Sequence, residues 1–214
     1  MARPTKQDPE RGEARTRLLA AARDVIRARG FAATTVDDVC KAAGVTKGAF
    51  FHHFESKEAL GVAAAGYWAE TTSALFAHAP YHDHDDPLDR LIGYVEFRKA
   101  LIEGDLAEFT CLVGTMTQEV YGSHPAIRDA CAASIFGHAA TLEPDIRAAM
   151  EARGIAAEWT AASLAAHPQA VLQGAFILAK ATGDRAIALE SVDHLRRYLE
   201  MLFTAPAAGA RKSA

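Results

Sequence analysis

The stretch GVTKGAFFHHFESKEAL, residues 44–60, constrains the fold more than any other part of the sequence. In the interior of a long helix, Gly48 would cost about 1 kcal/mol of stability relative to alanine. Three phenylalanines within five residues, at positions 50, 51 and 54, are unusual for a surface segment. We therefore predict a helix of about two turns that is capped by Thr46 and packs against a larger body.

Helical spacing of apolar residues recurs along the chain, and strand patterns do not. Starts and stops are marked by Thr, Ser and Asp-Pro at the beginnings and by glycine at the ends. The sequence predicts an all-α protein of about nine helices. Besides the helix at Thr46, we expect helices over residues 13–28, 36–43, 56–76, 88–101, 106–121 and 125–152, one ending at Gly183, and one over 186–203.

Residues 35–54 form a helix-turn-helix pattern. Thr35 is placed to cap the first helix, with Asp38 in a capping-box position, and Gly44 begins the turn. In this motif the second helix enters the major groove of DNA with its N-terminal residues at the base edges. Phe50 and Phe54, four residues apart, are expected to anchor that helix to the core.

The charge distribution is compatible with this prediction. The net charge is −4, but residues 1–57 hold eleven Lys and Arg against seven Asp and Glu, while the rest of the chain is acidic. A basic region at one end of a chain fits a nucleic-acid-binding module. On charge alone, a solvated charged arm remains an alternative.

The segment TTVDDVCKAAGVTKGAFFHHFESKEAL resembles the N-terminal domain of the TetR/AcrR family of transcriptional regulators, over about residues 13–62. The resemblance implies a homodimer that binds a palindromic double-stranded operator and represses transcription until a small-molecule effector releases it. The expected organisation is a flexible basic arm (1–12), a DNA-binding domain (13–62), an effector-binding and dimerisation domain (63–204) and a disordered tail (205–214).

The resemblance also implies individual DNA contacts. Lys47, Gly48 and Ala49 match the tip that reads bases, and Thr46, His53 and Lys57 match phosphate contacts. The full set of expected DNA-binding residues is Thr35, Thr46, Lys47, Gly48, Ala49, Phe51, His52, His53 and Lys57. Two positions depart from the family pattern: Phe51 stands where tyrosine is common, and Glu55 stands where lysine is frequent.

The last two helices are candidates for a dimer interface. The final helix carries an apolar stripe, and the helix before it is apolar almost all round, which suggests burial on more than one side. Ordinary burial within one domain is the alternative, and the resemblance implies a four-helix interface between two copies. The expected interface residues are Gly174, Leu195, Tyr198, Leu199 and Leu202.

Two kinds of effector are compatible with the C-terminal sequence. FTCLVGTMTQEV together with QGAFILAKA resembles a subgroup that senses electrophiles and oxidants, which implies Cys111 as the sensor with Lys180 beside it. A non-covalent apolar ligand is the alternative. The residues expected to line the effector site are Trp68, Tyr94, Phe97, Cys111, Met116, Phe176 and Lys180. There are two further alternatives: Cys111 is plain core packing, or it is the nucleophile of a helical enzyme. No evident His–Cys–Asp arrangement supports the enzyme.

Several other classes are disfavoured. The sequence has no apolar run of about 18 residues and no secretory signal, so we expect a cytoplasmic protein without a membrane partner. The three cysteines are widely spaced and lack a CxxC motif, which argues against a disulfide framework or zinc ribbon. The histidines near residues 52 and 82–84 are expected at a DNA rim and in a solvated loop rather than as metal ligands, and no cofactor is expected.

Overall fold

The computed structural model describes residues 9–204, and this part of the chain is all-α, as predicted. It contains eleven α-helices and one short 3-10 helix, with no strand between residues 9 and 204. The chain divides into two compact units. The first comprises residues 1–71 and 111–134, and the second comprises residues 72–110 and 135–214. Residues 1–8 and 205–214, which include most of the expected arm and the whole tail, lie outside the described residues.

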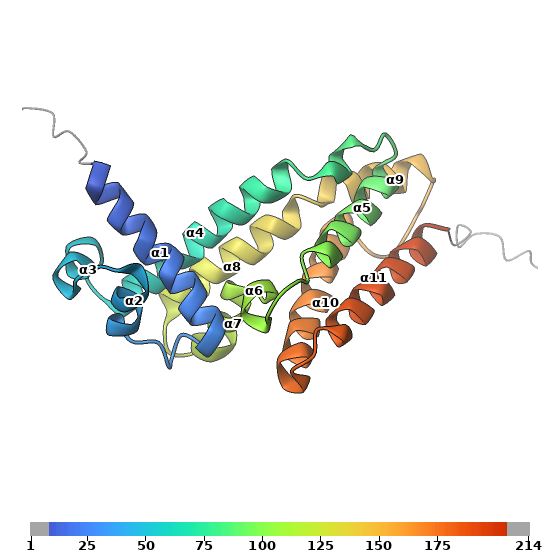
Figure 1. Cartoon of the computed structure of the whole chain (residues 1–214). Coiled ribbons are helices and arrows are strands. Elements are labelled where there is room, and N and C mark those ends of the chain that lie inside the picture. The colour runs from blue at the N-terminus through green and yellow to red at the C-terminus, as the bar shows by residue number, and fades with distance from the viewer. Residues whose placement is uncertain (1–8, 205–214) are drawn as a thin grey trace, which may run out of the picture. The chain divides into compact units, whose positions relative to one another are not determined.

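The first unit is built around α1 (Pro9–Arg29), which packs against α2 (Val36–Ala43), α3 (Lys47–His53) and α7 (Leu112–Val120) (Figure 1). The first turns of α4 (Lys57–Ala77) and α8 (Pro125–Ala140) complete it. Helix α1 begins earlier than expected, so residues 9–12 are helical, and it ends at Gly30 with a positive φ of 88°. Its core contains the fully buried residues Leu18, Ile26, Phe50 and Leu60.

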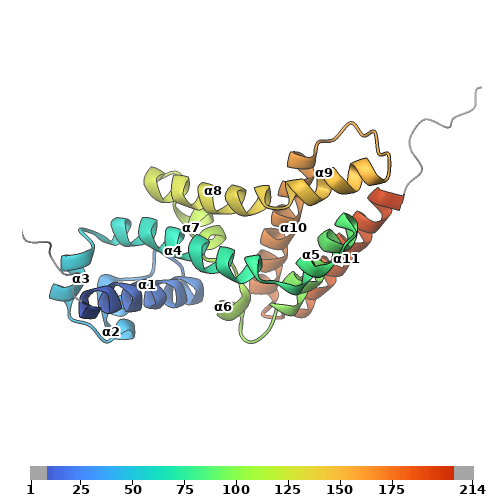
Figure 2. The ribbon, with the colours of Figure 1, turned by 90° about the horizontal axis from the view of Figure 1, so that it is seen from above.

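The second unit surrounds α5 (Pro87–Ala100). Helix α5 packs against α9 (Glu143–Ala152) and α11 (Ala186–Thr204), and α10 (Ala161–Thr182) packs against α9 and α11 (Figure 2). The short elements are the 3-10 helix η1 (Pro80–Asp83) and α6 (Leu106–Phe109). Ion pairs connect neighbouring segments of this unit: Arg90 with Asp145, Lys99 with Asp193, and Arg153 with Asp86.

Two predicted helices are each divided in the structure. The helix expected over residues 106–121 is interrupted at Thr110, whose backbone is extended (φ −77°, ψ 157°), and Cys111 then caps α7. The helix expected over 125–152 ends at Ala140, and α9 starts anew at Glu143 with Pro144 in its first turn. Proline lacks the N–H that would continue the earlier helix, so its position favours a new start.

Candidate operator-binding site

The helix-turn-helix is fixed by local side-chain caps. The Thr35 side chain accepts a hydrogen bond from the Asp38 N–H at 3.1 Å, and the Asp38 carboxylate accepts from the Thr35 N–H at 3.0 Å, which completes the predicted capping box. The hydrogen bonds from Thr35 hold the pKa of Asp38 below its usual value. Gly44 ends α2 in the left-handed conformation, with φ 64°. The Thr46 hydroxyl accepts from the Ala49 N–H at 3.2 Å and starts α3.

The faces of α3 are divided as the sequence predicted. Phe50 and Phe54 are buried against the core, and their ring centroids lie 5.7 Å apart. On the opposite side, Lys47 and Gly48 are exposed, and Phe51 is 52% exposed. The inner face of α3 is thus apolar and buried, and its outer face is open to solvent.

Most of the other expected DNA contacts also lie on the exposed part of this segment. Thr46 and His52 are exposed, and Ala49 and His53 are half-buried. Thr35 is exposed, but its hydroxyl donates to Asp38 at 2.7 Å, so it already serves the α2 cap. The structure thus exposes Thr46, Lys47, Gly48, Phe51 and His52 along α3, from its N-cap to its last turn.

Lys47 makes an ion pair within the unit. Its Nζ lies 3.0 Å from an Asp37 carboxylate oxygen, and both side chains are more than half exposed. Exposed pairs of this kind contribute little to stability, about 0–1 kcal/mol. An acceptor on DNA can therefore compete with Asp37 for Lys47 at small cost.

Lys57 also makes contacts within the first unit, and its expected phosphate contact stays a prediction. Its Nζ donates to the Ala32 carbonyl oxygen at 3.2 Å and lies 4.5 Å from the centre of the Phe31 ring. The side chain is thus directed to the turn between α1 and α2. Partial burial lowers the pKa of Lys57, and the nearby charge of Glu119 acts in the opposite direction.

The residues expected at the effector site are divided between the two units. Trp68, Cys111 and Met116 belong to the first unit, whereas Tyr94, Phe97, Phe176 and Lys180 belong to the second. Trp68 stacks with the Arg27 guanidinium at 5.1 Å, and Met116 is fully buried. Lys180 is exposed near the end of α10, and its predicted proximity to Cys111 stays a prediction.

In the second unit, Tyr94 is the centre of a buried polar network. The Gln169 amide donates to the Tyr94 hydroxyl at 2.9 Å, and His138 Nε2 lies 3.1 Å from the same oxygen. Phe76 and Tyr81 make ring contacts with Tyr94, and Phe97 contacts the Phe76 ring edge-on. Burial, together with the charge of Arg98, lowers the pKa of His138 to about 4. Tyr94 and Phe97 were among the residues expected at the effector site, which stays a prediction; His138 and Gln169 were not, because polar residues spaced this far apart carry no local signal.

The three cysteines have different environments. Cys40 and Cys131 are buried, and burial raises the pKa of both thiols, that of Cys131 to about 11. Cys111 is partly exposed at the N-cap of α7, where its sulfur accepts from the Gly114 N–H at 3.4 Å. Of the three thiols, that of Cys111 is the most accessible to solvent.

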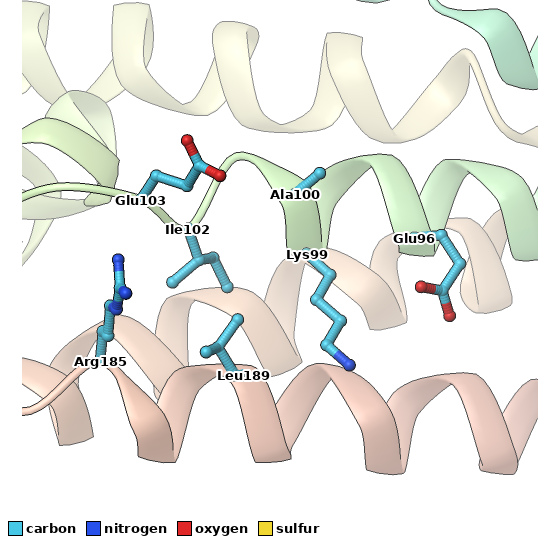
Figure 3. Close-up of a pocket in the computed structure, with 7 residues that line it drawn as sticks. All are labelled: Glu96, Lys99, Ala100, Ile102, Glu103, Arg185 and Leu189. Carbon is cyan, nitrogen blue, oxygen red and sulfur yellow. The ribbon is translucent and has the colours of Figure 1, made fainter.

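A groove of about 410 Å³ opens on the second unit beside α5 and α11 (Figure 3). Ile102 and Leu189 form its apolar part. Two of its charged residues are already paired: Lys99 with Asp193 at 2.5 Å and Glu96 with Arg196 at 3.2 Å. The lining residues are Glu96, Lys99, Ala100, Ile102, Glu103, Arg185 and Leu189. No residue expected at the effector site lines this groove.

The expected dimer residues need a correction. Leu195 and Leu199 are 2% and 0% exposed within the single chain, so they belong to the core of the second unit and cannot form an outer seam. The stripe of α11 is buried by its own unit because α11 packs against both α5 and α10. Tyr198 is 44% exposed, and Gly174 and Leu202 are half-buried.

Another set of apolar side chains is exposed on the same two helices. Met201 on α11 is 69% exposed, and Ile177 on α10 is 46% exposed. A ring contact of 4.9 Å between His167 and Tyr198 joins the outer faces of α10 and α11. Around Gly174 an added Cβ would meet nothing within 4 Å, so this part of the face is open.

Two further searches of residues 9–204 bear on other functions. No group of three or more His, Cys, Asp or Glu side chains is placed to hold a metal ion in this range. Within the same range, none of the helices is both long enough and apolar enough to cross a membrane.

Similarity to solved structures extends over almost the whole chain. A TetR transcriptional regulator from Chloroflexus aurantiacus J-10-FL is 28% identical, with a TM-score of 0.77, and the match covers 90% of this chain and 97% of that one. The reduced form of NemR from Escherichia coli is 23% identical, with a TM-score of 0.74 over 86% and 95% of the two chains. A cysteine mutant of the TetR family regulator CifR, complexed with a 26-bp double-strand operator DNA, is 20% identical with a TM-score of 0.71, covering 92% and 98%. At identities below 25%, the last two show the fold alone.

Sequence relatives match over shorter segments. The HTH-type transcriptional regulator TtgR of Pseudomonas putida is 36% identical over 88 residues, and the match covers 41% of each chain. The repressor KstR2 of Rhodococcus jostii is 48% identical over 46 residues, 22% of each chain. This chain thus spans about two fifths or less of the length of these relatives.

Two family models match the chain itself. Residues 18–64 match the model of bacterial regulatory proteins of the tetR family. Residues 87–195 match the model of the tetracyclin repressor-like C-terminal domain, which accounts for more than half of the chain. The chain therefore belongs to the TetR family of bacterial transcriptional regulators.

Proposed function

We propose that this TetR-family regulator is a dimeric repressor that holds a palindromic operator through α3 and releases it when an effector binds. The observation that supports the DNA-binding role most strongly is the construction of α3. Its inner face is anchored by buried Phe50 and Phe54, and its outer face presents Lys47, Gly48 and Phe51 to solvent. A rigid, capped helix with an exposed N-terminal tip is what major-groove reading requires.

The dimer would form through the outer faces of α10 and α11. Ile177, Tyr198 and Met201 supply exposed apolar area there, and Gly174 permits close approach of a second helix. A twofold axis through this face relates two identical reading heads, by which we mean the helix-turn-helix of each subunit (residues 35–54). A palindromic operator has the same twofold symmetry.

The experiment that tests the proposal is selection of bound sequences from a random DNA pool by the full-length protein. A palindromic consensus with two half-sites is the expected result. Recovery of no consensus, or of a site without twofold symmetry, would contradict the dimeric reading mode. A Lys47→Ala variant serves as the control, because it should fail to enrich the same sequence.

For the effector, we propose a reactive electrophile or oxidant that modifies Cys111. This thiol is partly exposed at a helix N-terminus, whereas Cys40 and Cys131 are buried. With an α,β-unsaturated carbonyl, the thiolate would form a C–S bond to the β-carbon, and the α-carbon would take a proton from water. The added group would change volume and charge at the start of α7.

The test is to treat the complex of protein and selected DNA with a stoichiometric unsaturated carbonyl and to map adducts by mass spectrometry. Cys111→Ser should prevent release, and Cys131→Ser should not. If Cys111→Ser is released like the parent protein, the covalent mode fails. Release of that variant by an unreactive apolar compound would instead support the non-covalent alternative.

A further inference from the structure

The turn between α1 and α2 is held by two oppositely charged side chains at a single residue, Ala32. The Ala32 N–H donates to a Glu119 carboxylate oxygen at 2.9 Å. The Ala32 carbonyl oxygen accepts from the Lys57 ammonium at 3.2 Å. The anion is thus on the donor and the cation on the acceptor, so both contacts match the polarity of the backbone and are charge-assisted.

The two side chains come from different helices of the first unit. Lys57 is the first residue of α4, and Glu119 lies in the last turn of α7, 87 residues after Ala32. The turn therefore connects α1 to α2 while being fastened to both α4 and α7. Because α2 leads directly into α3, the position of this turn sets the position of the reading helix.

The surroundings are shaped around this arrangement. Gly30 has φ 88°, and a Cβ added there would meet the Glu119 carboxylate, so the glycine makes room for Glu119 as well as adopting the left-handed conformation. Phe31 is buried beneath the turn and meets His124 edge-to-face at 5.7 Å. Gly61 on α4 is equally constrained, because an added Cβ would lie 2.8 Å from the Phe31 ring.

We infer that Glu119 and Lys57 form a clamp on Ala32 that positions the helix-turn-helix for operator binding, and that Lys57 acts as a positioning residue rather than as a phosphate contact. This rests on the proposed DNA-binding function. It also gives α7 a direct connection to the reading head, since Cys111 caps the helix whose last turn carries Glu119. A movement of α7 would pull on Ala32 without any change in α3 itself.

The clamp and the phosphate contact predict different salt dependences. A lost phosphate contact lowers the slope of log affinity against log salt by about 0.9 per contact, whereas lost positioning weakens binding at an unchanged slope. We therefore propose measuring the affinity of Lys57→Met for the selected operator over a salt series, beside Lys47→Met. The expected result is about tenfold weaker binding with the parental slope for Lys57→Met and a reduced slope for Lys47→Met. An equally reduced slope for Lys57→Met would overturn the positioning role.

The direction of the change in operator affinity in Glu119→Ala distinguishes a clamp residue from an acidic residue that only lies on the surface. Removing an exposed carboxylate reduces repulsion from DNA, so an acid without a positioning role should leave affinity unchanged or raise it. The clamp predicts about tenfold weaker binding, partly restored in Glu119→Gln, which keeps a neutral acceptor. Glu70→Ala, an exposed acid on α4 of the same unit, is the matched control. If Glu119→Ala behaves like Glu70→Ala, the clamp is not functional.

A measurement on the free protein separates the clamp from the proposed function. Hydrogen exchange of the Ala32 amide, followed by NMR, should be slow in the parent and faster in Glu119→Ala, because this N–H loses its acceptor. Equal exchange rates in the two proteins would refute the clamp even if operator binding is confirmed. Conversely, a protected Ala32 amide in a protein that selects no DNA would leave the clamp standing and refute the DNA-binding proposal.

Discussion

His138 lies in the second unit with its ring against Tyr94 and Phe76, and its lowered pKa favours the neutral form near pH 7. Its pKa is lowered to about 4 by burial, whereas an unfolded histidine titrates near 6.5. Between these values the unfolded chain binds more protons than the folded one, so stability falls as pH is lowered from about 6.5 towards 4.

We expect the parent protein to lose roughly 2 kcal/mol of unfolding free energy from this residue between pH 7 and pH 5. Urea denaturation at the two pH values measures the loss. His138→Gln keeps a polar side chain without a titratable ring, and its stability should change less over the same range. Identical pH dependence in the two proteins would contradict a buried neutral His138.

Gly48 occupies the exposed tip of α3, and the nearest atom to an added Cβ is the Thr46 hydroxyl oxygen at 3.8 Å. The free protein therefore has room for a side chain there. Gly48→Ala should even stabilise the helix slightly, by up to about 1 kcal/mol.

For operator binding, substitution of Gly48 should be unfavourable rather than stabilising. Gly48→Ala should weaken operator binding, and Gly48→Val should abolish it, because a side chain at the tip fills the space where backbone and DNA approach. Anisotropy measurements with circular dichroism as the folding control test this. Tight binding by folded Gly48→Val would mean that α3 is not the reading element.

At the scale of elements, the helix-turn-helix could be predicted almost completely from sequence because its signals are local. Thr35, Thr46 and Gly44 act on neighbours within four residues, and all three cap where expected. The breaks at Thr110 and Thr141 were missed because an apolar pattern continues across both of them, although Pro144 was a local signal of a new helix start after the second break.

The dimer face shows a different limit. A periodic apolar stripe reveals that a helix face is buried, but not which partner buries it. Leu195 and Leu199 were assigned to a second subunit, and the structure buries them within the chain. The clamp on Ala32 was missed for a related reason, since Glu119 is 87 residues away and no local pattern links them.

The exposed face of α10 and α11 leads to a prediction about assembly. Ile177→Glu and Met201→Glu each place a charge on the proposed interface while leaving the monomer core intact. Sedimentation should show folded monomers with weaker operator affinity, since the two heads are no longer held at a fixed spacing. Leu195→Glu is the contrasting variant: a charge at this buried site costs several kcal/mol and should unfold the second unit. A stable dimer in both surface variants would place the interface elsewhere.

At the scale of the whole molecule, the charge distribution separates a DNA-binding part of the chain from the rest. The N-terminal 57 residues carry an excess of basic side chains, and the remainder is acidic. Like charges repel, so the acidic remainder disfavours contact with DNA and confines binding to the reading heads. The residues that match the model of bacterial regulatory proteins of the tetR family, and the exposed tip of α3, also lie towards this N-terminal end of the sequence.

The most direct test of the central claim, that this regulator binds its operator through the basic reading heads, is a salt titration of binding to the selected operator. Phosphate contacts release counterions, so log affinity should fall linearly with log salt, with a slope of several units. A scrambled duplex of the same length should bind far more weakly at every salt concentration. Binding that is independent of salt, or equal for the two duplexes, would contradict the account.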